Sequence, residues 1–155
     1  MTHNPPVARA LQAMGIPHRV FRHTRPITSL EEAAAARGQS PRQIVRSILF
    51  RTGKESYVLV LAAGPEQLSW PALRRHLGQS RLTMATPAEV LEVTGYRVGA
   101  VGPLGLKTPL PVLVDASVLA QEEISCGSGE RGVAVILRVE DLLRALGDYQ
   151  VVNLR

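Results

Sequence analysis

The chain has 155 residues, of which 45% are hydrophobic and 20% are charged. This length is typical of one domain, and the high apolar content excludes an intrinsically disordered protein. The longest apolar stretch, residues 57–63, is far shorter than the roughly 20 residues that span a bilayer, and residues 1–10 lack the apolar segment of a signal peptide. A single cysteine, Cys126, excludes an internal disulfide, so we expect a cytoplasmic protein with no membrane partner.

The net charge is +5, and the positive charge comes almost wholly from arginine. Lys54 and Lys107 are the two lysines among 18 basic residues. Arginine presents a planar fork of donors that suits phosphate groups, so the charge is compatible with a nucleic-acid partner as well as with an ordinary solvated surface. Aromatic residues make up 4% of the chain, too few to indicate a stacking platform for single-stranded nucleic acid.

Periodicity, capping residues and turn residues predict helices and strands in an irregular order along the chain. In the first half we expect a helix over 5–14, a strand over 18–22, a helix between Ser29 and Gly38, a short helix from Pro41, and a hairpin of strands 45–51 and 57–62. In the second half we expect a helix between Ser69 and Gly78, a strand over 81–84, a helix between Thr86 and Gly95, strands over 111–115, 123–125 and 133–139, a helix over 140–146, and an edge strand over 149–154. Without strict βαβ alternation, this order indicates an α+β fold with a mixed, curved sheet, in a single domain of residues 1–155.

Two of the helix starts carry a capping box. In this motif a Ser or Thr side chain accepts a hydrogen bond from the backbone three residues later, and a Glu at that position reaches back. Ser29 with Glu32 and Thr86 with Glu89 fit the pattern.

Residues 127–132 match the spacing G-x-G-x-x-G, but the surrounding sequence argues against a dinucleotide site. That site needs a helix after the glycines, whereas the apolar run 133–137 is typical of a strand. We therefore expect a hairpin-like loop whose backbone N–H groups could face an anion.

Isolated histidines and one cysteine do not indicate a metal centre. No two of the histidines are spaced as metal ligands on a helix, and we expect neither a metal site nor a cofactor. The histidines are His3, His18, His23 and His76. Cys126 has no local signature of a catalytic nucleophile and is interpreted as a small buried residue at a strand end.

Two charged residues in apolar surroundings stand out. Asp115 ends the strand 112–115, where a carboxylate serves either a site or the cap of the next turn. Arg46 lies in the otherwise apolar run 44–50. A charge there is paired, faces a cleft or points to solvent on the outer face, and strand alternation alone does not decide between them.

Four segments in this order resemble the YbaK family, which comprises free-standing and prolyl-tRNA synthetase-associated aminoacyl-tRNA editing domains. The segments are Val45–Leu49, Thr94–Gly105, Leu110–Asp115 and Ser125–Gly132. The resemblance extends from about residue 5 to residue 146, and its most specific part is Gly99–Pro103, which fits the family's G-x-x-x-P loop.

The resemblance implies a barrel-like mixed sheet with helices packed around it. It also implies hydrolysis of the ester that joins a wrong, small amino acid such as alanine or cysteine to tRNA. The partners it implies are the acceptor end of mischarged tRNA and an aminoacyl-tRNA synthetase.

The resemblance and the chemistry of ester hydrolysis together suggest site residues. The catalytic candidates are Arg46, Gly99, Gly102 and Pro103. The candidates for substrate binding are His23, Ser47, Val101, Asp115, Gly127, Ser128 and Gly129. A glycine-rich loop lets backbone N–H groups approach a developing oxyanion, and Ser128 offers a hydroxyl from the opposite wall.

Two departures from the family pattern bear on activity. Arg46 stands where the family strand usually carries lysine, and Ala134 stands where some relatives carry aspartate. Arg46 keeps the charge but replaces a compact ammonium with a wide fork. Two alternatives to an editing hydrolase therefore stay open: a module that binds tRNA or aminoacyl-adenosine without turnover, and a hydrolase of another small ester.

Overall fold

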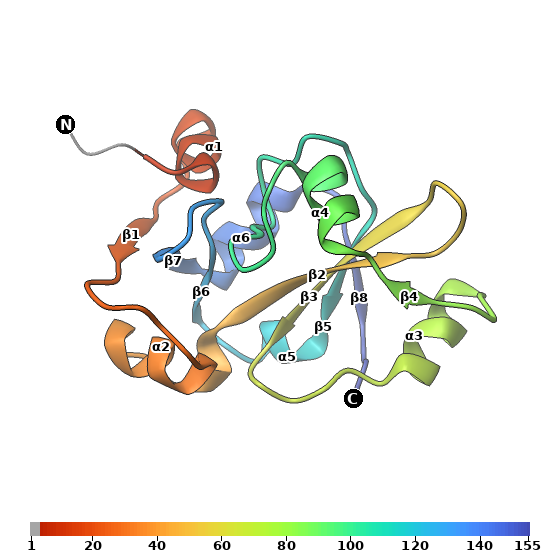
Figure 1. Ribbon diagram of the computed structural model, residues 1–155. Coiled ribbons are helices and arrows are strands. Elements are labelled where there is room, and N and C mark those ends of the chain that lie inside the picture. The colour runs from red at the N-terminus through yellow and green to blue at the C-terminus, as the bar shows by residue number, and fades with distance from the viewer. Residues whose placement is uncertain (1–3) are drawn as a thin grey trace.

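The computed structural model describes residues 4–155, so His3, one of the four histidines, lies outside the described part of the chain. The helices are α1 (Pro6–Met14), α2 (Leu30–Arg37), the 3-10 turn η1 (Pro41–Gln43), α3 (Trp70–Leu77), α4 (Pro87–Thr94), α5 (Ala116–Leu119) and α6 (Val139–Leu146). The strands are β1 (Arg19–Arg22), β2 (Val45–Arg51), β3 (Tyr57–Ala63), β4 (Thr83–Met84), β5 (Val112–Asp115), β6 (Glu123–Gly127), β7 (Val133–Arg138) and β8 (Gln150–Val152). Figure 1 shows α1 and β1 at one end of the molecule and α3 with β4 at the other.

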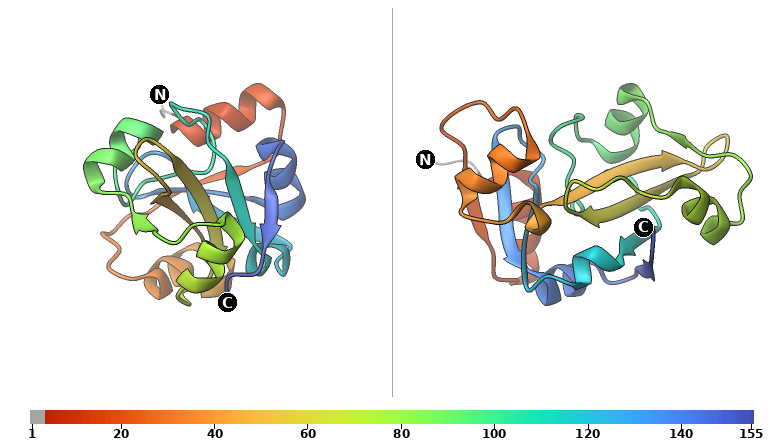
Figure 2. Two further views of the ribbon diagram at one scale, coloured as in Figure 1. Left: turned by 90° about the vertical axis from the view of Figure 1, so that its right-hand side faces the viewer. Right: turned by 90° about the horizontal axis from the view of Figure 1, so that it is seen from below.

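The strands form two sheets that run in different directions (Figure 2). The larger has the order β4-β2-β3-β5-β8, antiparallel at β2–β3 and parallel at β3–β5 and β5–β8, and the smaller has the order β1-β7-β6. A single parallel bridge, Ile44 to Ser125, joins them. The expected α+β fold with a mixed, curved sheet is confirmed. The sheets do not close into a barrel within residues 4–155, because β6 meets the edge of β2 only at that bridge.

Local sequence signals place most element ends where the structure has them. Thr86 and Glu89 form the complete capping box of α4. At α2 only half of the predicted box is present: the Ser29 hydroxyl accepts from the Glu32 N–H, but the Glu32 carboxylate accepts from the Thr28 hydroxyl at 2.7 Å. The predicted strand 81–84 is shorter than expected, because only residues 83 and 84 pair with β2.

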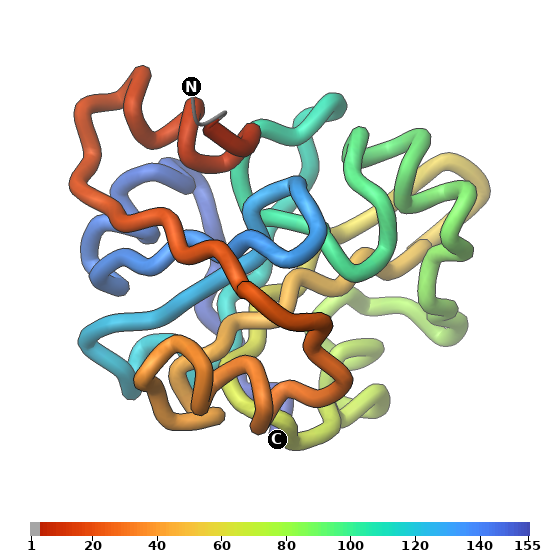
Figure 3. The backbone as a smooth tube through the Cα atoms, turned by 60° about the vertical axis from the view of Figure 1, so that its left-hand side comes forward, coloured from red at the N-terminus to blue at the C-terminus, as the bar shows by residue number. Residues whose placement is uncertain are grey.

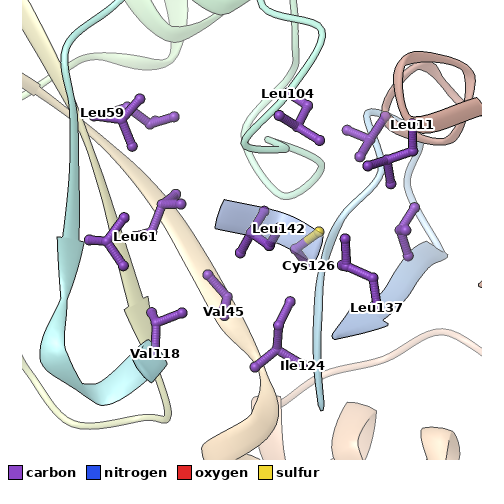
Figure 4. Close-up of a cluster of buried hydrophobic side chains, with 14 of the residues drawn as sticks. Leu11, Val45, Leu59, Leu61, Leu104, Val118, Ile124, Cys126, Leu137 and Leu142 are labelled. Carbon is purple, nitrogen blue, oxygen red and sulfur yellow. The ribbon is translucent and has the colours of Figure 1, made fainter. Parts of the chain in front are cut away.

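The main core lies between the two sheets, with α1 and α6 packed against it. Figure 4 shows leucines of both sheets and of α1 around Cys126, whose thiol points into the cluster. Burial raises the pKa of this thiol to about 12, so it stays protonated and non-nucleophilic at neutral pH. The interpretation of Cys126 as a buried small residue is confirmed.

A second cluster covers the opposite face of the β2–β3 hairpin. Phe50 and Val60 pack there against Leu73 of α3, and Trp70 meets Phe50 edge to face at 5.3 Å between ring centroids. Val45 and Leu49 belong to the first cluster, so alternate side chains of β2 enter different cores. Odd-numbered β2 side chains therefore point toward the first cluster, and even-numbered ones toward the second.

Candidate functional site

A pocket of about 520 Å³ lies where the two sheets diverge. Its size is within the range of ligand pockets, about 300–1,000 Å³. Its walls are the edge of β2, the start of α4 with the residues before it, the loop after α4 and the end of β6. The lining residues are Arg37, Ile44, Val45, Arg46, Ser47, Ile48, Leu49, Met84, Ala85, Pro87, Val90, Val98, Gly99, Val101, Cys126 and Gly127.

The β2 wall of this pocket is the edge of the strand. Six consecutive residues, 44–49, line the pocket, although alternate side chains lie on opposite faces of a strand. Residues from both faces of a strand can line one pocket only where the pocket lies along the exposed edge of that strand. β6 touches this edge at Ile44, and β4 pairs with it at residues 50 and 51. The residue after β4 continues the contact, because the Leu49 carbonyl accepts from the Ala85 N–H at 3.0 Å. The residues between them form a gap in the hydrogen-bonded edge.

Ser47 lies in that gap. The Leu59 N–H donates to the Pro111 carbonyl, so the backbone polar groups of the odd-numbered β3 residues point toward β5. The even-numbered residues of β3 therefore hydrogen-bond to their register partners in β2, which are also even-numbered. The N–H and C=O of Ser47 therefore point to the open edge. The Ser47 hydroxyl oxygen is also buried with no hydrogen-bond partner. Three polar groups of one residue thus face the pocket unpaired, an arrangement that buried polar groups adopt rarely without a ligand.

The loop after α4 and the end of β6 both contribute lining residues and form the facing wall of the pocket. The backbone of this loop runs close to the β6–β7 turn (Figure 3). Gly99 has φ +93°, a conformation that favours glycine, and lines the pocket together with Val101. Among residues 4–155, the N–H groups of Gly99 and Val101 have no hydrogen-bond acceptor. A Cβ on Gly127 would overlap the Val101 carbonyl oxygen, so glycine at 127 permits the loop to lie against β6.

Other glycine-loop candidates lie behind this wall and outside the pocket lining. Gly102 and Pro103 are buried, and a Cβ on Gly102 would overlap Val7 of α1. Gly129 is packed against Tyr96 and Pro6, and its N–H donates to the Ala100 carbonyl at 2.9 Å. These contacts hold the loop in place.

Ser128 is fully buried, and its hydroxyl donates to the Val133 carbonyl at 2.7 Å. It accepts in turn from the Glu130 N–H at 3.1 Å. The side chain thereby shapes the β6–β7 turn, and the structure does not place it at the pocket. That turn is the expected hairpin loop between two antiparallel strands.

Arg46 leaves β2 on the face of the second cluster. Its Nη2 donates to the Glu66 carbonyl at 2.6 Å, and its Nε is buried without a partner. Burial lowers the pKa of its guanidinium most, and nearby Arg155 lowers it further, against the opposing charges of Glu66 and Asp115. Arg46 thus borders the pocket through the strand edge, while its guanidinium belongs to a polar cluster under the sheet.

Asp115 belongs to the same cluster and caps α5. Its carboxylate is fully buried and accepts from the Ser117 N–H and from the Leu154 N–H at 2.8 Å. Arg155 lies 3.5 Å away. Of the two interpretations left open for Asp115, the cap is the one that the structure contains, and Asp115 lines neither of the pockets described here.

A second pocket of about 720 Å³ adjoins the first. The two share Arg37, Gly99 and Gly127. The other lining residues of the second pocket are His23, Thr24, Arg25, Pro26, Ile27, Arg131, Gly132 and Val133. Of the predicted site residues, the two pockets bring together Arg46, Ser47, Gly99, Val101, Gly127 and His23.

Arg37 is the residue that sequence reasoning missed. It ends α2, where an arginine is typical of the last helical turn, so nothing local marks it. Its Nε donates to His23 Nε2 at 3.1 Å and its Nη1 to the Ser125 hydroxyl at 2.9 Å. Only the folded chain brings these three residues together, because they come from three separate segments.

Within residues 4–155, no three His, Cys, Asp or Glu side chains are grouped so that they could hold a metal ion. No described helix combines the length and the apolar character needed to cross a bilayer.

Comparison with known proteins identifies the family. The model of the aminoacyl-tRNA editing domain matches residues 24–145, which include every lining residue of both pockets except His23. The chain belongs to the aminoacyl-tRNA editing domain family. This result confirms the resemblance drawn from the sequence segments.

Individual relatives agree with this assignment. A proline–tRNA ligase of Kosmotoga olearia is 35% identical over 106 residues, which are 68% of this chain and 18% of the ligase. A proline–tRNA ligase of Thermosipho melanesiensis is 29% identical over 134 residues, 84% of this chain and 23% of the ligase. The chain thus spans about a fifth of the length of these curated relatives.

A solved structure matches over nearly its whole length. It is described as "a putative trans-editing enzyme for prolyl tRNA synthetase", with 32% identity and a TM-score of 0.87, covering 99% of each chain. The fold of this chain therefore matches that solved chain almost from end to end.

Proposed function

We propose that the protein hydrolyses the ester bond of mischarged aminoacyl-tRNA in trans, in the cytoplasm, and clears a small amino acid such as alanine or cysteine. The observation that carries the proposal is the gap in the β2 edge at Ser47, which faces the Gly99 loop across an apolar pocket. Similarity to proline–tRNA ligases and to a structure described as a trans-editing enzyme suggests that the tRNA is one that prolyl-tRNA synthetase mischarges.

The chemistry requires little from the side chains. Water attacks the ester carbonyl, the negative charge develops on the carbonyl oxygen, and the C–O bond to the ribose breaks to release the amino acid and a free hydroxyl on the tRNA. Unpaired N–H groups at Ser47, Gly99 and Val101 are suited to stabilise that oxyanion, because they are fixed in place before the reaction. The Ser47 carbonyl is an acceptor for the α-ammonium group of the substrate.

The lining is proposed to select a small, apolar side chain. Val45, Met84, Pro87 and Val90 line the pocket with apolar side chains, which favour an apolar group over a polar one. Such a site complements a synthetase, because synthetases distinguish amino acids by one methylene weakly, by about 1–3 kcal/mol.

Arg46 is proposed to hold the β2 edge in its catalytic position from under the sheet, through the bond of its guanidinium to the Glu66 carbonyl. A lysine at this position donates to one carbonyl as well, so Arg46→Lys should retain most of the activity. Arg46→Ala removes both the charge and the bond, and we expect it to lower the deacylation rate about tenfold, the effect of one charged hydrogen bond.

A deacylation panel tests the proposal. Alanyl-, cysteinyl- and seryl-tRNA, each on tRNA(Pro) and on the cognate tRNA, are incubated with wild type, Arg46→Lys, Arg46→Ala and Ser47→Ala. We expect wild type to deacylate at least one mischarged tRNA(Pro), and Ser47→Ala to lower kcat about tenfold, because it removes a hydroxyl that has no partner within residues 4–155 and is proposed to bond the substrate, while the backbone N–H and C=O stay in place. Ser80→Ala is the matched control, since Ser80 is exposed and lines neither pocket.

Three results would contradict parts of the proposal. No turnover of any ester by wild type, with tRNA still bound, would favour a binding module over a hydrolase. Turnover that appears only in Arg46→Lys would show that arginine disables the site. Equal turnover of small aminoacyl esters with and without the tRNA body would favour a hydrolase of another ester.

A further inference from the structure

The second pocket has an unusual charge balance. Three of its eleven lining residues are arginines, Arg25, Arg37 and Arg131, and none is acidic. Within residues 4–155, no carboxylate pairs with any of the three. Eight other ion pairs are present in the described chain, so acidic partners exist but are placed elsewhere. Uncompensated guanidinium groups around one cavity fit an anion.

Arg37 is the innermost of the three. It is half-buried and lines both pockets, and its two bonds go to neutral acceptors, His23 Nε2 and the Ser125 hydroxyl. Burial lowers the pKa of Arg37 from its ordinary value, yet an arginine remains charged in proteins. Its charge is therefore desolvated without a counter-ion, which is costly unless a ligand supplies one.

His23 lies beside Arg37 as a neutral ring whose Nδ1–H is a hydrogen-bond donor. Burial first, and the Arg37 charge second, lower the pKa of His23, so the ring is neutral at pH 7. Because Nε2 accepts from Arg37, the ring hydrogen is on Nδ1, and this Nδ1 is buried with no partner. The ring therefore has an unused donor close to the Arg37 guanidinium.

The two pockets are continuous in their walls. Gly99 and Gly127 line both, so a chain that places an ester at the Ser47 edge continues past these glycines into the arginine pocket. Neither glycine has a side chain to block the passage. The first pocket is largely apolar and suits an amino acid, whereas the second is cationic and suits what is attached to it.

We infer that the second pocket binds a phosphate group of the RNA chain near its 3′ end, with Arg25, Arg37 and Arg131 as the cationic contacts. The inference rests on the proposed function, because it assigns the nucleotide side of the same substrate. Arg37 is the central contact, and Arg25 and Arg131 at the rim are exposed and approach the phosphate from solvent.

Binding of RNA that carries no amino acid tests the inference without requiring turnover. The probe is a fluorescent RNA stem-loop with a single-stranded CCA 3′ end, titrated by anisotropy with wild type, Arg37→Gln, Arg131→Gln and the control Arg75→Gln. Arg75 is an exposed arginine of α3, at the opposite end of the molecule (Figure 1). We expect Arg37→Gln and Arg131→Gln each to weaken binding about fivefold and to reduce the salt slope by about one, as for loss of a phosphate contact. Arg75→Gln should change binding less than twofold.

Two further arms identify the source of the phosphate. The same stem-loop without CCA should bind as weakly to wild type as the full probe binds to Arg37→Gln. AMP should displace the full probe at a concentration at which adenosine does not. Arg131→Gln keeps the test valid even if Arg37→Gln is misfolded, because Arg131 is exposed and its one bond, to the Val98 carbonyl, is 3.3 Å long.

Specific results would overturn the inference. Equal weakening by Arg75→Gln and the pocket variants would mean a general charge effect. Unchanged binding without CCA, or equal displacement by AMP and adenosine, would exclude an end phosphate in this pocket. If wild type hydrolyses no ester while the pocket variants still lose RNA binding, the proposed function fails and the phosphate site stands. If wild type hydrolyses the ester while the variants bind RNA normally, only the phosphate site fails.

Discussion

Arg37 and Arg155 occupy two environments that differ in one respect, the presence of carboxylates. Arg155 contacts Glu66 at 2.8 Å and Asp115 at 3.5 Å and also donates to the Ala63 carbonyl. Arg37 bonds to a histidine nitrogen and a serine hydroxyl, and no carboxylate of residues 4–155 pairs with it. The first guanidinium is satisfied by the protein and joins the C-terminal segment to the sheet. The second still lacks a counter-ion, which is what a binding site requires before its ligand arrives.

Removing Asp115 should break the satisfied environment most severely. Asp115→Ala deletes the acceptor of the Ser117 and Leu154 N–H groups and leaves Arg155 without one of its two carboxylates. We expect a loss of about 3–5 kcal/mol in the free energy of unfolding, as for removal of one partner of a buried ion pair. Urea denaturation monitored by circular dichroism measures it.

Glu140→Gln is the control for Asp115→Ala. Its ion pair with Arg138 is largely exposed, so its removal should change stability by less than about 1 kcal/mol. If Asp115→Ala were no more destabilising than Glu140→Gln, the carboxylate would not be anchoring α5 and the C-terminal segment.

The same substitution at both arginines sharpens the comparison. Arg155→Gln leaves a buried carboxylate with less compensation and should cost about 1–3 kcal/mol. Arg37→Gln removes a desolvated charge that no carboxylate balances, so we expect about 1 kcal/mol or less. Urea denaturation of both variants, side by side with the RNA titration, separates their roles. A larger stability loss for Arg37→Gln than for Arg155→Gln would mean that Arg37 is mainly structural.

The same contrast shows which features a sequence can reveal. The hairpin, the glycine helix ends and the Thr86 capping box depend on neighbours within a few residues, and all were predictable. Asp115 could be a cap or a site residue, because its local pattern fits both. The unpaired edge at Ser47 depends on where β4 and β6 meet β2, which is a property of sheet order.

Arg37 marks the limit of local prediction. Its partners His23 and Ser125 are 14 and 88 residues away in sequence. No periodicity or spacing rule connects them, whereas Arg46 stood out by its apolar neighbours in sequence and the family resemblance supplied a role for it and for the glycine loop. That resemblance did not indicate that the Arg46 guanidinium is engaged by the Glu66 carbonyl under the sheet.

The smallest effect we predict is a pH dependence that comes from His23. Its pKa in the folded protein is lowered from its ordinary value of 6.5, chiefly by burial and then by Arg37, with Arg25 and Arg131 as further cations around the same pocket. The unfolded chain therefore binds a proton more readily than the folded one, and stability decreases as the pH falls below about 6.5.

His23→Gln keeps an acceptor for the Arg37 Nε but does not titrate, so the decrease in unfolding free energy between pH 7 and pH 5 should be shallower. His76→Gln, at an exposed histidine bonded to Gln150, is the matched control. Its unfolding free energy should decrease between pH 7 and pH 5 as much as that of wild type. Urea denaturation at pH 7, 6 and 5 decides the point, and parallel curves for wild type and His23→Gln would mean that Arg37 and His23 are not coupled as the geometry indicates.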